Sequence, residues 1–271
     1  MARVNGIFKV TGSLQNVSFY TMKGSDKVYM RTKGGPSARR LKKGPEFELV
    51  RRHQSEWKGC VLFSRYLCSC MDSIYRMRDY NVSPVINGMA KQLVKEDTVN
   101  EVGQRSILLS KAREVFEGFN LNKQFPFNTV FRTSLYVEVD RIAGKMKVSI
   151  PRILTANDLY NVQKLPFFRL KFNLSYISDM YHTPNDSYKC FEETTAQYGF
   201  LREESITEWF STSDVIPAQQ IETNLEISRT EAELQHITFL AMAGIEFGTT
   251  VAGGAIEPVK HACCAKILKA C

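Results

Sequence analysis

Residues 168–176 read FRLKFNLSY, and they alternate large apolar side chains with polar ones at every position. Successive side chains of a β-strand point to opposite faces of its sheet, so the apolar residues of this stretch share one face. This is the most regular two-residue period in the chain. We therefore predict a β-strand here with one buried face.

Further strand patterns lie on both sides of this stretch. Five of them combine β-branched or aromatic residues with neighbouring turn signals: 136–140, 146–150, 221–227, 237–247 and 259–268. Gly144 stands between the first two, where a tight hairpin needs a positive φ. We predict an antiparallel β-sandwich of immunoglobulin-like type over residues 124–271, with a polar insertion at about 180–210.

The first 123 residues have a different periodicity. Three short stretches have strand character: 6–10, 17–22 and 27–33. Apolar residues then recur at three- to four-residue spacing and predict three helices: 45–76, 83–94 and 106–116. We predict a basic domain over 1–123, built from a β-meander and a helical layer, so that the whole chain is of the α+β class.

Charge follows the same division. Residues 1–123 contain 22 Lys or Arg against 11 Asp or Glu, whereas residues 124–271 contain 14 against 17. No apolar run approaches the roughly 20 residues that a membrane helix requires, and no secretory signal pattern is present near Met1. We expect a chain without a membrane-spanning segment, cytoplasmic at synthesis, which is then incorporated into a larger particle.

The seven cysteines indicate a reducing compartment. Two zinc alternatives exist: Cys68 and Cys70 with His53, and Cys263 and Cys264 with His261. Neither matches the two spaced pairs of ligands that structural zinc sites use, so we interpret the cysteines as core thiols. We expect neither a metal nor another cofactor.

Catalytic motifs are missing from the sequence. It contains no glycine-rich phosphate loop between a strand and a helix, no G-x-S-x-G elbow and no H-E-x-x-H pair. The four histidines are scattered, and the pairs Glu192-Glu193 and Glu203-Glu204 lie in polar stretches typical of solvated surface. We expect a protein that is not an enzyme.

The most distinctive feature is a basic segment at residues 31–52. It is rich in glycine and proline, which predicts an open backbone, and its eight cations are Arg31, Lys33, Arg39, Arg40, Lys42, Lys43, Arg51 and Arg52. These residues are candidates for docking onto a partner subunit. The alternative is binding of nucleic acid, in which Phe19, Tyr20 and Tyr29 would stack on bases.

The N-terminal sequence also resembles a known family. The stretches that carry the resemblance are MARVNGI at 1–7, GSLQNVSFY at 12–20, RTKGGP at 31–36 and GFNLN at 118–122. They are similar to a family of short Bacteroidetes proteins without an established activity, and the similarity is architectural only beyond residue 122. It implies a compact N-terminal element joined to a β-rich domain.

These observations favour a structural or interaction protein. By fold analogy, such an architecture suits a subunit of a phage-like, filamentous or surface assembly. The partners would be further copies of the chain or other protein subunits, contacted through edge strands, the polar insertion or the basic segment.

Overall fold

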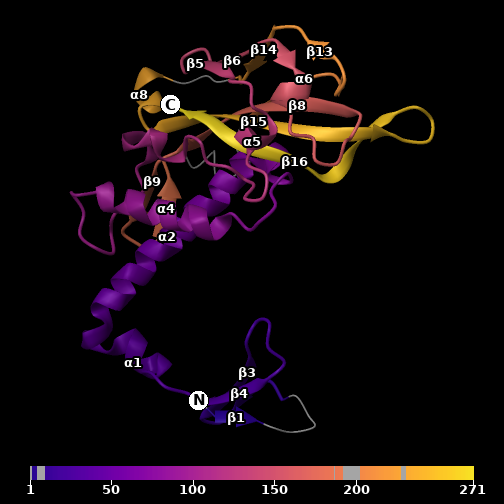
Figure 1. The fold of residues 1–271 in the computed structure, drawn as a ribbon. Helices are drawn as coiled ribbons and strands as arrows, with labels where there is room; N and C mark the ends of the chain where they lie inside the picture. The colour runs from indigo at the N-terminus through magenta and orange to yellow at the C-terminus, as the bar shows by residue number, and fades with distance from the viewer. Residues whose placement is uncertain (1, 5–9, 186, 192–201, 227–229) are drawn as a thin grey trace. The chain divides into compact units, whose positions relative to one another are not determined.

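A computed structural model describes residues 2–4, 10–185, 187–191, 202–226 and 230–271 (Figure 1). The chain forms two compact units, Met1–Arg51 and Arg52–Cys271, called unit 1 and unit 2 below. It is a mixed α+β protein with a small N-terminal sheet, helices, and a largely antiparallel β-rich C-terminal region. The predicted α+β class is therefore confirmed.

Unit 1 is a four-stranded antiparallel sheet followed by a short helical segment. Its strands are β1 (Ala2–Val4), β2 (Gly12–Leu14), β3 (Val17–Thr21) and β4 (Val28–Thr32), in the order β1-β4-β3-β2. Helix α1 (Ala38–Lys43) and the 3-10 turn η1 (Pro45–Phe47) follow. The strands predicted at 17–22 and 27–33 are confirmed, whereas the one predicted at 6–10 lies almost entirely outside the described residues.

The helices of unit 2 match the predicted positions in two of three cases. Helix α2 (Glu48–Cys70) begins just before the unit boundary, and the one-turn α3 (Asp72–Tyr75) and α4 (Ser83–Glu96) follow it. The helix predicted at 106–116 is wrong. That segment forms two 3-10 turns, η2 (Leu109–Lys111) and η3 (Arg113–Phe116).

Backbone pairing explains why this third helix does not form. Ile107 N–H donates to the Met180 carbonyl at 2.8 Å, and Met180 N–H donates back to the Ile107 carbonyl at 2.9 Å. This bridge draws the segment into an extended conformation before η2. The apolar residues of 106–116 thus contact residues that are distant in sequence. The local pattern contains no record of those contacts.

Two antiparallel sheets form the β-rich part of unit 2. The larger has the order β11-β8-β15-β16, with the two-residue β12 also paired to β8. Its strands are β11 (Arg202–Ile206), β8 (Phe167–Ser178), β12 (Phe210–Ser211), β15 (Ile237–Thr250) and β16 (Ile256–Ala270). The smaller has the order β14-β6-β5, made of β14 (Gln219–Asn224), β6 (Lys145–Ile150) and β5 (Tyr136–Asp140). The predicted strands are confirmed.

Short elements complete this unit. Two further strand pairs are β9 (Met180–Thr183) with β10 (Ser187–Cys190), and β7 (Ile153–Leu154) with β13 (Val215–Ile216). Three one-turn helices are α5 (Phe127–Val130), α6 (Thr155–Asp158) and α8 (Glu231–Leu234). The β9–β10 hairpin and strand β11 fall in the predicted polar insertion, and residues 192–201 of that insertion lie outside the described residues.

The larger sheet is covered on both faces. Phe168, Leu170, Phe172, Leu174 and Tyr176 pack with buried residues of β6 in one core. On the other face, α2 and α4 supply a second core, in which the Cys70 thiol donates to the Tyr176 carbonyl at 3.3 Å. Because the helices share this core with the sheet, the boundary between the compact units lies at residues 51/52, not at the predicted 123/124.

The β15–β16 hairpin extends beyond the rest of the larger sheet (Figure 1). Its tip around Gly253 and Gly254 contains no charged side chain between Val251 and Ile256. Nearer its base the pairing is irregular, since Glu246 pairs with Cys263 but Gly248 pairs with Pro258. Residues 259–262 therefore bulge opposite a single residue of β15.

Candidate functional site

The basic segment is folded, in contrast to the open backbone that its glycines and prolines predicted. Ser37 caps α1, with its hydroxyl oxygen accepting the Arg40 N–H at 3.3 Å. Gly34 and Gly35 precede this cap, and Gly44 follows the last helical residue. The breakers thus delimit a six-residue helix, because a capped turn needs only a short stretch between them.

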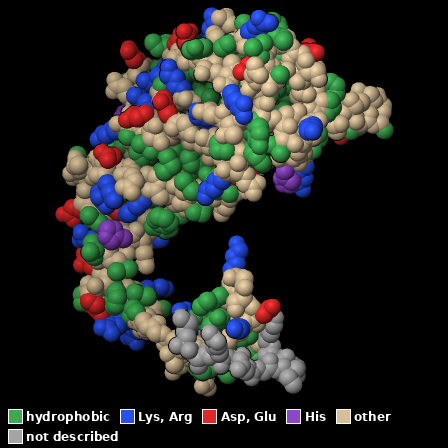
Figure 2. Space-filling model, in the orientation of Figure 1, with side chains coloured by type: hydrophobic (Ala, Val, Ile, Leu, Met, Phe, Trp, Pro, Cys, Tyr) green, Lys and Arg blue, Asp and Glu red, His purple; other side chains and the backbone are tan. Residues whose placement is uncertain are grey.

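Four of the predicted docking residues lie on α1 and are exposed: Arg39, Arg40, Lys42 and Lys43. Arg40 pairs with Glu46 at 2.7 Å, and this contact lowers the pKa of the Glu46 carboxyl. Figure 2 shows Lys and Arg side chains gathered over α1. The helix is therefore a cationic surface, on which the Arg40 side chain is engaged by a neighbouring carboxylate.

Arg51 and Arg52 have local roles instead. The Arg51 guanidinium donates to the carbonyls of Leu41 and Gly44, at 2.9 and 2.8 Å, and so closes the C-terminal end of α1. Arg52 is the first residue of unit 2 and pairs with Glu101 at 3.3 Å. We therefore remove both from the candidate interface, which keeps Arg31, Lys33 and α1.

The register of the unit 1 sheet divides its residues between two unlike faces. Residues paired across antiparallel strands share a face. One, called the apolar face here, holds Leu14, Val17, Phe19, Thr21, Val28, Met30 and Thr32. The other, called the tyrosine face, holds Ser13, Ser18, Tyr20, Tyr29 and Arg31.

The tyrosine face joins two aromatic rings and a cation. Tyr20 and Tyr29 are paired across β3 and β4 and stack with centroids 5.9 Å apart and ring planes 30° apart. The Arg31 guanidinium carbon lies 5.5 Å from the Tyr20 centroid. Phe19, which the sequence interpretation grouped with the two tyrosines, is on the opposite face. Strict alternation along β3 could have revealed that separation.

The apolar face has little cover within unit 1. Val28, at 4% exposure, is the only buried hydrophobic among the described residues up to Arg51, and Leu14 is 69% exposed. Neither hydrophobic core of the described residues includes a member of unit 1. A sheet of this size needs a packed partner on one face for stability, so the apolar face is an incomplete core.

Charge is divided as sharply as burial. Residues 1–51 contain eleven Lys or Arg and three Asp or Glu, whereas residues 52–271 contain 25 of each kind. The whole formal charge of +8 therefore belongs to unit 1. A small body with this charge attracts anionic partners over the length of the electrostatic screening distance.

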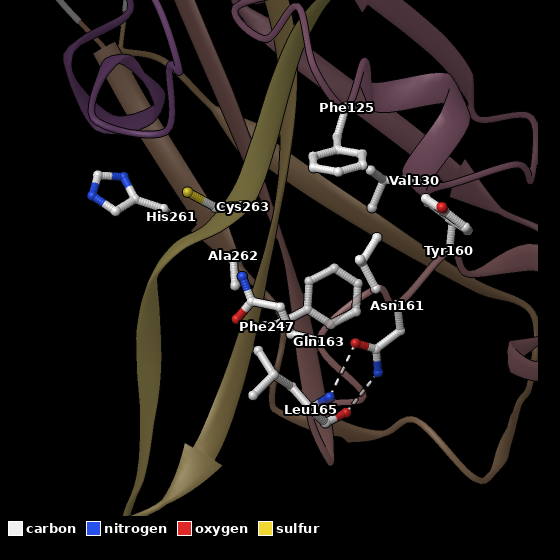
Figure 3. A pocket seen from close by; sticks show the side chains of 11 residues that line it. Phe125, Val130, Tyr160, Asn161, Gln163, Leu165, Phe247, His261, Ala262 and Cys263 are labelled. Carbon is white, nitrogen blue, oxygen red and sulfur yellow. Dashed lines mark hydrogen bonds between the residues drawn. The ribbon is translucent and has the colours of Figure 1, made fainter.

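Unit 2 contains a small apolar hollow of about 80 Å³ at the base of the β15–β16 hairpin. The rings of Phe125, Tyr160 and Phe247 surround it (Figure 3), and the Asn161 side chain holds the neighbouring loop by two hydrogen bonds to the Leu165 backbone, at 2.7 and 3.0 Å. His261 also lines the hollow, at a φ of 64° that costs a residue with a side chain some strain. Such a surface suits a hydrophobic side chain or a small apolar molecule.

One buried carboxylate in unit 2 is fully compensated. Glu56 accepts from the Arg105 Nε at 2.7 Å, from the Gly103 N–H at 2.8 Å and from the Lys91 ammonium. Burial opposes its ionisation, but these donors outweigh burial and lower its pKa to about 2. The cluster ties α2 to α4 and to the following loop, which is a structural role.

A second buried carboxylate brings together residues that are distant in sequence. Asp179 accepts from the Ser110 N–H at 2.9 Å and from the Ser110 hydroxyl at 2.6 Å, and its Oδ2 lies 3.7 Å from the His236 Nδ1. The same Nδ1 is 2.9 Å from the Tyr181 hydroxyl. Burial raises the Asp179 pKa. The serine bonds to the carboxylate and not to the imidazole, so this is not the geometry of an activated nucleophile.

The cysteines of both zinc alternatives behave as core thiols. Burial raises the pKa of Cys263 to about 11 and raises that of Cys70 and Cys264 further. In the described part of the chain, no three His, Cys, Asp or Glu side chains come together to hold a metal ion. No helix there has the length and apolar character of a membrane span.

Comparison with family models, curated proteins and solved structures finds no match for this chain. Its function must therefore be argued from the two surfaces of unit 1 and from the hollow of unit 2. The sequence pattern located the cations of α1 but gave no sign of the hollow, whose residues come from four separate segments.

Proposed function

We propose that this chain is a non-enzymatic subunit of a larger assembly, and that it joins further copies of itself through the apolar face of unit 1. The observation that carries the proposal is the incomplete cover of this face, on which Val17, Phe19 and Met30 are half-buried and Leu14 is exposed. Its hydrophobic side chains line one side of a folded sheet, yet Val28 alone is buried among the described residues of the unit.

Self-association is supported by the composition of this face. The paired residues on it include no charged side chain, so two copies can meet there without burying a charge. The charge of +8 elsewhere on the unit opposes the approach of two copies at low ionic strength. Association should therefore strengthen as salt screens that repulsion.

Several finer predictions remain proposals. The two sheets that face each other across one core support an immunoglobulin-like sandwich in unit 2. By fold analogy, a compact N-terminal element joined to a β-rich domain supports a phage-like, filamentous or surface assembly as the setting. The absence of a serine–histidine contact at Asp179 supports a role without catalysis.

Light scattering on the purified full chain tests the proposal. After nuclease treatment and at about 0.5 M salt, where the screening length falls to a few ångströms, we expect a mass that is a multiple of 30.9 kDa. Phe19→Asp places a charge on the apolar face and should return the chain to a monomer. Ser18→Asp, on the opposite face of the same strand, should leave the mass unchanged.

Hydrogen–deuterium exchange separates this outcome from a trivial one. A wild-type monomer under these conditions would overturn the proposal, and protected β3 and β4 amides in that monomer would show that the sheet is nonetheless folded. Equal loss of mass in both variants would also overturn it, because charge alone would then explain dissociation.

A further inference from the structure

Unit 1 carries two further features that differ in character from the apolar face, namely the tyrosine face of the sheet and the cations of α1. Tyr20 and Tyr29 stack on each other with ring planes 30° apart, and the Arg31 guanidinium lies over the Tyr20 ring. Seven positions after Arg31, the capped helix α1 begins and presents a compact set of cations. We propose that these two features together bind single-stranded nucleic acid, with the tyrosines against bases and α1 against phosphates.

Stacking is the step that separates this ligand from other polyanions. Both tyrosines are half-buried and held across adjacent strands, so their rings are pre-positioned and partly open. Aromatic residues on a sheet surface contribute affinity to unpaired bases because every base has a π-face, whereas paired bases within a duplex keep their faces covered. An arginine beside the rings adds a cation–π contribution.

The expected phosphate contacts come from cations that follow the tyrosines along the chain. Arg31 lies in β4 and Lys33 just after it, and the six-residue step from Thr32 to Ala38 at the start of α1 spans at most about 20 Å. A strand of several nucleotides can cover such a length, within the usual site sizes of single-strand binders. Arg39, Lys42 and Lys43 then remain for phosphates, since Arg40 pairs with Glu46.

Charge complementarity favours this ligand over a neutral partner. The full formal charge of +8 lies on residues 1–51, and unit 2 contributes none. An acidic protein would satisfy the cations but would make no particular use of two stacked tyrosines. The proposal goes beyond self-assembly and does not depend on it, because it uses the opposite face of the sheet.

Fluorescence anisotropy with the full chain provides the test. The probes are fluorescein-labelled oligo-dT and oligo-U of about 20 nucleotides, a duplex of equal length, and labelled heparin. We expect single strands to bind more tightly than duplex, and the DNA and RNA probes decide which nucleic acid is preferred. For five phosphate contacts, the plot of log affinity against log salt should have a slope of about −3.5.

Two sets of variants separate stacking from charge. Tyr20→Leu with Tyr29→Leu should weaken single-strand binding by about 5- to 150-fold for each base that loses its stack, and should leave heparin binding unchanged. Tyr20→Phe with Tyr29→Phe keeps the rings and should restore affinity. Arg39→Gln, Lys42→Gln and Lys43→Gln together should weaken all anionic probes and reduce the slope by about 2.

The α1 variants keep the test decisive if the leucine variants disturb the sheet, because their side chains lie outside it. Three results would overturn the proposal. One is no binding of any oligonucleotide tighter than about 100 μM at low salt. The others are single-strand and heparin affinities that fall together in the leucine variants, and tighter binding to an acidic peptide that ignores those variants.

Discussion

The strands of unit 1 and unit 2 pair in the same antiparallel manner. The two units differ in how far the apolar faces of those strands are buried. In unit 2, the alternating residues of β8 meet a second sheet on one side and two helices on the other, and Phe172 is fully buried. In unit 1, β3 has an equally regular alternation, but Phe19 remains partly exposed. An apolar face on a strand therefore predicts burial only where the chain also supplies a partner.

The surroundings of two particular glycines, Gly59 and Gly34, differ in the same way. A methyl group at Gly59 of α2 would lie 2.6 Å from the Tyr188 ring, whereas Gly34 has no atom within 4 Å of the corresponding position. Unit 2 is packed closely enough for the absence of one side chain to matter. In unit 1, Gly24 instead serves a turn, at a φ of 82°.

Truncating matched phenylalanines should produce the largest difference between the units. Phe172→Ala should lower the free energy of unfolding by about 3–5 kcal/mol, because it opens a cavity in a fully enclosed core. Phe19→Ala in monomeric protein should cost less than about 1 kcal/mol of global stability. Urea denaturation followed by fluorescence of Trp57 and Trp209, which both lie in unit 2, measures how far each change destabilises that unit, and equal losses would mean that the two units share one core.

Removing the charge of Glu56 should destabilise unit 2 by about 3 kcal/mol, since its pKa is lowered from 4.5 to about 2 by donors that the folded state supplies. A lowered folded-state pKa means that the stabilisation is present above pH 4.5 and is lost as the pH falls toward 2. Unfolding of Glu56→Gln should therefore depend less on pH across this window than unfolding of the wild type. Asp179→Asn is the control, because burial raises the pKa of that carboxyl and ionisation does not stabilise it.

Adding a methyl group at Gly59 should cost about 1–3 kcal/mol, because the Tyr188 ring is fixed by its hydroxyl, which donates to the Arg105 carbonyl at 2.8 Å. Gly88→Ala in α4 meets nothing within 4 Å and should stabilise the protein by up to about 1 kcal/mol. Thermal unfolding of the two variants compares them directly. A stable Gly59→Ala protein would show that β9 and β10 yield to α2 at little cost.

Removing the cap of α1 should have the smallest effect. Ser37→Ala deletes one acceptor for the Arg40 N–H and should weaken α1 locally by about 1 kcal/mol. Unit 2 should unfold at an unchanged urea concentration, because α1 contributes no buried residue. Hydrogen exchange at residues 38–43 detects the change, and Ser13→Ala, in the sheet of the same unit, controls for loss of a hydroxyl.

The sequence predicted the strands of unit 2 better than it predicted the division of the chain into units. Alternation from Phe168 to Tyr176 located β8, and Gly144 located the β5–β6 hairpin at its φ of 63°. Both features are local, so a short window contains them. The division at residue 51 depends instead on α2 packing against β8, about a hundred residues away, and no local pattern records that contact.

The candidate surfaces were predictable to unequal degrees. The cations of α1 follow from composition, although the helix that carries them was hidden between closely spaced breakers. The opposition of Phe19 and Tyr20 follows from alternation alone. The hollow beside Phe247 depends on the bulge at residues 259–262, which exists only because β16 pairs with a particular register of β15.

The uneven distribution of charge has a consequence for the chain as a colloid. With 25 acidic and 25 basic side chains, unit 2 alone would be close to its isoelectric point at neutral pH. Molecules without net charge repel one another least and precipitate most readily. Proteolysis near residue 51 would therefore remove the source of the mutual repulsion that keeps the chain dispersed, and the fragment 52–271 should have its lowest solubility under physiological conditions.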